Sequence, residues 1–116
     1  MKIEPDEPIR DNLPNGMIDW VEISEFIVDI LHPKYRGTGT KGWQAIDDPS
    51  ITNTLQENSI RVLKILCEDL YGYFYKLHVD RNIVWRRMEN YIREKYNGLS
   101  EEALYWIITT YRIDDR

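Results

Sequence analysis

The stretch that decides the fold spans residues 49–77 and reads PSITNTLQENSIRVLKILCEDLYGYFYKL. Its apolar side chains recur mostly at steps of three, four and seven residues, the spacing of one face of an α-helix. They are Ile51, Leu55, Val62, Leu63, Leu66, Leu70, Phe74 and Leu77. Asp48 is suited to cap this helix, with Pro49 at the first helical position. We therefore expect one long central helix from residue 49 to about residue 77, with Leu66 and Leu70 in the core.

Two shorter helices are expected after the long one. Asp80 is suited to cap a helix that runs to about Tyr96, and Asn97-Gly98 is typical of a helix C-terminus. Ser100 is suited to cap a last helix, whose first turn carries acidic residues where the helix dipole favours them. The inner faces of the two helices consist of Val84, Met88, Tyr91 and Ile92, and of Leu104, Ile107, Ile108 and Tyr111.

Residues 17–32, before the long helix, also have helical periodicity, and Pro33 ends the pattern. The apolar face consists of Trp20, Ile23, Ile27 and Ile30. Four acidic residues follow the same spacing and form a face of their own: Asp19, Glu22, Glu25 and Asp29. Residues 1–16 contain three prolines and an Asn-Gly turn signal, so we expect an irregular arm there.

These patterns predict an all-α fold with one domain, residues 1–116, built as a bundle of about four main helices with the arm at its N-terminus. An alternative stays open, because short apolar runs are ambiguous. Residues 73–79 also alternate in the manner of a strand, and residues 83–87 could supply a second strand. The result would be an α+β fold with a short hairpin at about residues 73–87.

The composition is that of a globular protein, with 42% hydrophobic and 30% charged residues and a formal net charge of −5. Residues 1–33 hold eight acidic residues against two basic ones, whereas residues 76–97 hold six basic residues against three acidic ones. The single cysteine, Cys67, excludes an intrachain disulfide. Neither a signal peptide nor a membrane-spanning run is visible. We expect a cytoplasmic protein that does not enter a membrane.

Residues 37–42 fit the G-x-G-x-x-G pattern of phosphate-binding loops. The context of the pattern argues against that role, because no strand precedes it and no helix opens at its third glycine. The surrounding segment is basic and aromatic, with Lys34, Arg36 and Lys41 beside Tyr35 and Trp43. We therefore interpret Tyr35 and Trp43 as candidates for contact with a partner.

No catalytic or metal-binding signature emerges from the remaining reactive residues. His32 and His78 are the only histidines, and neither has metal-ligand spacing to the other or to Cys67. Cys67 lies on or beside the apolar face of the long helix, where a thiol usually acts as a small hydrophobic side chain. Glu68 and Asp69 follow it and are expected in solvent. We expect no metal, no cofactor and no enzymatic activity.

Aromatic residues gather in two places that could serve binding. Residues 71–75 hold four rings in five positions, which cannot all face inward from one helix, so Tyr73 and Tyr75 are candidates for a partner surface. Residues 81–96 combine several arginines and Lys95 with Trp85, Tyr91 and Tyr96. Cations next to stacking rings are typical of nucleic-acid surfaces.

In size, acidity and lack of catalytic motifs the chain resembles bacterial toxin-immunity proteins, including those of contact-dependent growth inhibition systems. The resemblance implies an inhibitor that neutralises a basic partner such as a nuclease toxin. We expect the partner to contact Asp19, Glu22, Glu25, Asp29, Tyr35, Trp43, Tyr73 and Tyr75. A nucleic-acid-associated helical protein that uses residues 81–96 is the alternative, and a small enzyme is a third.

Overall fold

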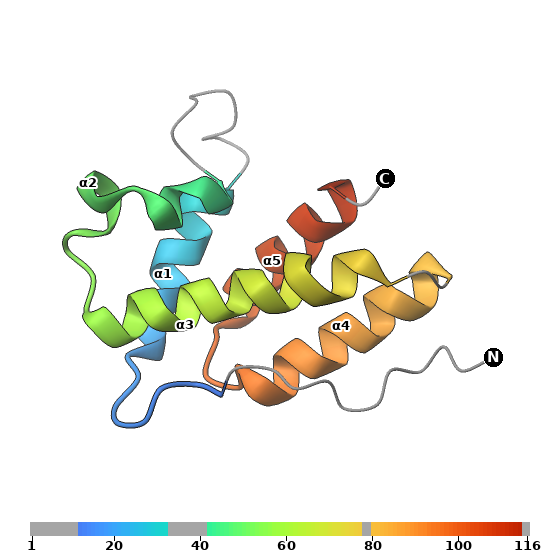
Figure 1. Cartoon of the computed structure of the whole chain (residues 1–116), viewed down its shortest axis with the longest axis horizontal. Helices are drawn as coiled ribbons and strands as arrows, with labels where there is room; N and C mark the ends of the chain where they lie inside the picture. Colours follow the sequence, from blue (N-terminus) through green and yellow to red (C-terminus); the bar gives the residue numbers. More distant parts are fainter. Residues whose placement is uncertain (1–11, 33–41, 78–79, 115–116) are drawn as a thin grey trace.

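The computed structural model describes residues 12–32, 42–77 and 80–114, and within these ranges every regular element is helical. The chain folds as an all-α bundle, as predicted (Figure 1). The alternative hairpin at residues 73–87 is wrong: its described residues end one helical segment and begin the next helix, α4 (Arg81–Lys95). Asp80 starts α4 because its carboxylate accepts a hydrogen bond from the Asn82 N–H at 2.8 Å.

Helix α1 spans Trp20–Leu31, slightly less than the predicted range. It begins where it does because Asp19 Oδ1 accepts the Glu22 N–H at 3.0 Å, which makes Asp19 the N-cap. The helix ends before Pro33, as the sequence indicates. Ile23, Ile27 and Ile30 face the interior with at most 2% of their surface exposed.

The predicted helix over residues 49–77 is not continuous, and this is the main correction to the expected fold. A single turn, α2 (Pro49–Thr52), is followed by a break, and α3 starts anew at Glu57–Cys67. Asp48 caps α2 as expected, since its Oδ1 accepts the Ser50 N–H at 3.0 Å. The start of α3 is stabilised by a contact with another helix: the carboxylate of Glu22 on α1 accepts a hydrogen bond from the Gln56 N–H at 3.2 Å.

Beyond α3 the chain stays helical in a different hydrogen-bonding pattern. A π-helical segment, η3 (Glu68–Tyr73), continues directly into a 3₁₀ turn, η4 (Phe74–Lys76). An added Cβ at Gly72 would meet the carboxylate of Glu68, the flexible end of a side chain that can move aside.

The last helix, α5, spans Glu101–Asp114, and its packing against α1 is the most extensive between helices of the fold. Ser100 caps it as predicted, since its Oγ accepts the Ala103 N–H at 3.0 Å. The Ser100 N–H in turn donates to Ser24 Oγ on α1 at 2.9 Å, so the start of α5 is tied to α1. A short 3₁₀ segment, η2 (Trp43–Asp47), adds Ala45 and Ile46 to the core.

The core lies where α3 and η3 cross α1 and α5 (Figure 1). Leu66 and Leu70 are fully buried, which confirms the predicted inner face of residues 57–77. The other fully buried large side chains include Ile23, Ile27, Leu63, Met88, Ile92, Tyr96, Ile107 and Tyr111. In the part of the chain that the structure describes, no helix has the length and apolarity needed to cross a membrane.

Replacement of Leu66 by alanine should lower the free energy of unfolding by about 2–5 kcal/mol, because a fully buried site loses both transfer energy and packing. Urea unfolding followed by circular dichroism would measure it. The control is Lys64→Ala, two residues away on the exposed face of α3, which should change the stability by less than about 0.5 kcal/mol. Equal effects at both positions would contradict the packing described above.

Candidate partner-binding groove

A groove with a volume of about 380 Å³ lies where the first half of α1 meets the connection into α5. Its lining consists of Trp20, Val21, Ser24, Glu25, Val28, Gly98, Ser100 and Glu102. Apolar surface predominates in this lining, and the two charged side chains that the described residues contribute to it are both carboxylates. We call it the α1–α5 groove. It offers apolar contact and negative charge together.

One wall of the groove is the indole of Trp20, which is held in place from the side of the α4–α5 connection. A Cβ at position 98 would collide with this indole, so only glycine allows the close approach. The ring of Tyr96 meets Trp20 edge-on, with the ring centroids 6.4 Å apart. The indole is therefore a fixed surface.

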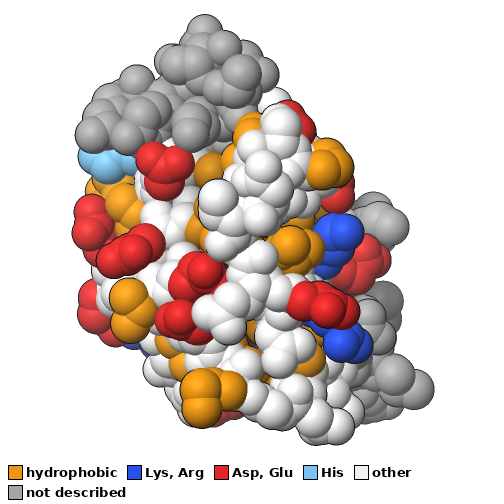
Figure 2. All heavy atoms as spheres, turned by 90° about the vertical axis from the view of Figure 1, so that its left-hand side faces the viewer, with side chains coloured by type: hydrophobic (Ala, Val, Ile, Leu, Met, Phe, Trp, Pro, Cys, Tyr) orange, Lys and Arg blue, Asp and Glu red, His pale blue; other side chains and the backbone are white. Residues whose placement is uncertain are grey.

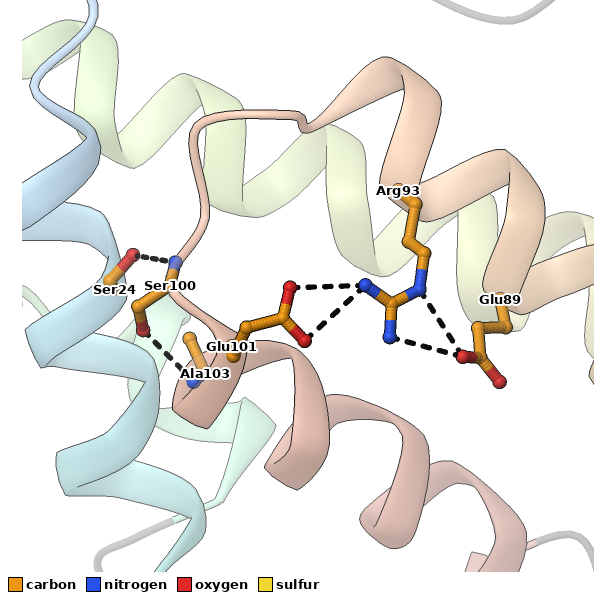
Figure 3. A network of polar contacts seen from close by, with 6 residues as sticks. All are labelled: Ser24, Glu89, Arg93, Ser100, Glu101 and Ala103. Atoms are coloured by element: carbon orange, nitrogen blue, oxygen red, sulfur yellow. Dashed lines mark hydrogen bonds and ion pairs between the residues drawn. The ribbon is translucent and has the colours of Figure 1, made fainter.

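A polar network keeps the two sides of the groove in register (Figure 3). Besides the link between Ser24 and Ser100, Arg93 on α4 bonds to Glu101 at 3.1 Å and to Glu89 at 3.2 Å. The hydrogen bond to Glu101, followed by the one to Glu89, raises the pKa of the Arg93 guanidinium. Glu101 is thus engaged by Arg93, while its neighbour Glu102 lines the groove.

The four acidic residues predicted on one face of α1 have different roles in the structure. Asp19 caps its own helix and also accepts Gln56 Nε2 at 3.0 Å. Glu22 caps α3 and accepts the hydroxyl of Ser59 at 2.5 Å. Glu25 is exposed and lines the groove, whereas Asp29 is half-buried one turn further along.

The predicted aromatic contacts lie elsewhere. Trp43 lines a second hollow of about 510 Å³ next to Cys67 and Tyr71. Tyr73 packs edge-on against Phe74, and Tyr75 is 41% exposed with its ring 6.0 Å from that of Tyr111. Tyr35 lies outside the described residues. Of the predicted residues that the structure describes, only Glu25 lines the α1–α5 groove.

The groove contains residues that the sequence analysis did not nominate. Trp20 and Val28 were assigned to a helix without a binding role, and Glu102 was read only as a favourable residue in a first helical turn. The one signal in the sequence was Val21, an apolar residue that falls outside the stripe of Trp20, Ile23, Ile27 and Ile30. The structure shows it 68% exposed. The role of Gly98 depends on a contact with Trp20 that no local pattern reveals.

Cys67 has the surroundings of a structural thiol. Burial, followed by the nearby charges of Asp47 and Glu68, raises the pKa of Cys67 to about 12. A thiol with such a pKa is almost fully protonated at neutral pH and is a poor nucleophile. Its side chain is partly exposed and packs against the edge of the core, so Cys67 belongs to the border of the core and not to its centre.

The prediction that Asp69 lies in solvent is wrong, because only 1% of its surface is exposed. Its Oδ2 accepts Lys95 Nζ at 2.8 Å and the hydroxyl of Tyr96 at 2.6 Å. Burial, followed by the hydrogen bond to Asp69, raises the pKa of Tyr96. Lys95 is therefore part of an internal ion pair, not of an outward-facing basic surface.

Other cations of residues 81–96 are engaged within the fold as well. Arg93 has the two glutamate partners described above, and Arg81 donates to the carbonyl oxygen of Leu77 at 2.8 Å. Tyr96, one of the predicted stacking rings, is 1% exposed. Several of the basic and aromatic side chains of residues 81–96 thus form contacts that stabilise the fold.

Comparisons of this chain with protein-family models, with curated proteins and with solved structures found no match. Among the described residues, no group of three or more His, Cys, Asp or Glu side chains is arranged to hold a metal ion. The function must therefore be inferred from the geometry and charge of the groove.

Glu22→Ala should lower the free energy of unfolding by about 1–2 kcal/mol, because the N-terminus of α3 loses its cap and Ser59 loses its acceptor. Glu25→Ala is the matched control: it lies on the same helix, is exposed, and should change stability by less than about 0.5 kcal/mol. Thermal or urea unfolding measures both. Equal losses would show that Glu22 does not cap α3.

Alkylation of Cys67 by iodoacetamide at pH 8 should be at least about a hundredfold slower in the folded protein than in urea, because the thiolate is the reacting form. Since the folded-state pKa is raised, the rate should rise as the pH increases toward 12. Mass spectrometry of the modified protein gives the rates. Equal rates in the two states at pH 8 would contradict the buried thiol.

Proposed function

We propose that this chain is a protein-binding module of the immunity type, which neutralises a basic partner such as a nuclease toxin by docking through the α1–α5 groove. The observation that carries the proposal is that the described residues give the groove a mostly apolar lining and two carboxylates, Glu25 and Glu102. A basic protein surface that carries some apolar side chains is complementary to it.

The surface around the groove is also acidic and carries exposed apolar side chains. Residues 12–32 contain no lysine or arginine, and Figure 2 shows acidic side chains spread over this side of the molecule with hydrophobic ones between them. Met17 and Val21 are 88% and 68% exposed at the start of α1. Exposed apolar residues next to like charges have no stabilising role in the isolated fold, but both become favourable against a basic partner.

The charge distribution also suggests how such a partner is caught. An acidic surface attracts a basic protein over about 8 Å at physiological ionic strength, which raises the association rate. The apolar part of the groove then slows dissociation, since its contacts form only after docking. A nuclease whose basic substrate-binding surface is covered in this way would lose access to nucleic acid.

The alternative, direct nucleic-acid binding through residues 81–96, has weaker support. Phosphate contacts require available cations. Lys95 and Arg93 pair with Asp69, Glu89 and Glu101. We therefore favour a protein partner over nucleic acid.

A photo-reactive residue placed at position 21 should capture the partner in the native host, with position 90 on α4 as the control site. We expect a basic protein that cross-links from position 21 only. The purified partner should lose its nuclease or other toxic activity when one equivalent of this chain is added. Unchanged activity at saturation would overturn the inhibitor role.

Glu25→Lys and Glu102→Lys should each slow association with that partner about tenfold at low salt, and the effect should shrink as salt is added. Stopped-flow or surface plasmon resonance measures the rates. Glu94→Lys, an exposed change of the same charge on α4, is the matched control. If the control slows association equally, only net charge matters and the groove is not the docking site.

A further inference from the structure

We infer that the α1–α5 groove is a receptor for an arginine side chain, which the partner inserts when it docks; the inference rests on the function proposed above. The structure brings together an aromatic wall, two carboxylates from different helices and aliphatic flanks. The aromatic wall and the carboxylates match the guanidinium group of an arginine side chain, and the aliphatic flanks match its methylene groups.

The aromatic wall suits the guanidinium group. The indole of Trp20 packs closely on Gly98 and meets the ring of Tyr96 edge-on, so it is positioned before a ligand enters. Tryptophan is the strongest aromatic partner for a cation, and a planar guanidinium stacks on it as well. Because the ring is fixed before binding, little conformational entropy is lost.

The two carboxylates of the groove come from different helices. Glu25 belongs to α1 and Glu102 to the first turn of α5, and the Ser24–Ser100 hydrogen bond joins the two helices between them. Within the described residues neither carboxylate has a hydrogen-bond or ion-pair partner of its own. A guanidinium presents several N–H donors in a fixed fork, so it can bond to carboxylates on two sides.

The remaining lining matches the rest of the side chain. Val21 and Val28 lie two turns apart on α1 and flank the groove. The methylene groups of arginine pack well on such apolar flanks while the charged end reaches the carboxylates. A lysine ammonium is compact and strongly hydrated, and it lacks the planar fork, so it would use the wall and the second carboxylate less well. An anionic ligand would be repelled.

The test uses two short probes, the peptides acetyl-Gly-Arg-Gly-amide and acetyl-Gly-Lys-Gly-amide, titrated into ¹⁵N-labelled protein. Saturable NMR shifts should appear at the Trp20 indole N–H and at the backbone N–H groups of Gly98 and Glu102. The arginine peptide should bind about tenfold more tightly than the lysine peptide. Glu25→Gln and Glu102→Gln should each weaken it about fivefold, whereas Glu94→Gln should have no effect.

The possible failures are distinguishable. Equal affinities of the two peptides at these signals would overturn the arginine receptor but leave docking by charge intact. Saturable shifts elsewhere, or none at all, would overturn it as well. If the arginine peptide binds as expected while the captured partner is insensitive to Glu25→Lys and Glu102→Lys, the receptor stands and the proposed docking function fails.

Discussion

The arrangement of the groove depends on the hydrogen bonds that the buried carboxylate of Asp69 accepts. It accepts hydrogen bonds from Lys95 Nζ at 2.8 Å and from the Tyr96 hydroxyl at 2.6 Å, which ties η3 to the end of α4. A buried charge without such partners would cost several kcal/mol. The contact fixes the point where the chain leaves α4, and therefore the position of Gly98. Trp20 packs on that glycine. The Asp69–Lys95 ion pair therefore helps to position one wall of the groove.

Five of the acidic residues of the chain illustrate two different roles. Asp19, Glu22 and Asp69 satisfy backbone or side-chain donors inside the fold. Glu25 and Glu102 instead line the groove, and the described part of its lining contains no basic residue. Asp19 and Glu22 make the negative charge of α1 partly structural, because their hydrogen bonds at helix N-termini offset the mutual repulsion of like charges. Glu25 and Glu102 are the part of the acidic surface on which the proposed function rests.

Much of the fold could be predicted from the sequence, whereas little of the groove could. The inner faces of the helices follow from their periodicity, and the caps at Asp48, Asp80 and Ser100 follow from residue type. The acidic face of α1 was recognised, but its division into capping and groove-lining residues was not. Asp69 was misplaced in solvent for the same reason: periodicity places a residue on a side of a helix, but it does not show which neighbour covers that side.

The sequence by itself determined the helices, because caps and apolar periodicity act between residues a few positions apart. Only the tertiary structure decided where the segment 49–77 is interrupted, since the cap of α3 comes from Glu22, 34 residues before Gln56. It also decided the groove, whose two sides are joined by a hydrogen bond between Ser24 and Ser100, 76 residues apart. Contacts at such separations depend on how the helices pack together, and no pattern within a single helix specifies them.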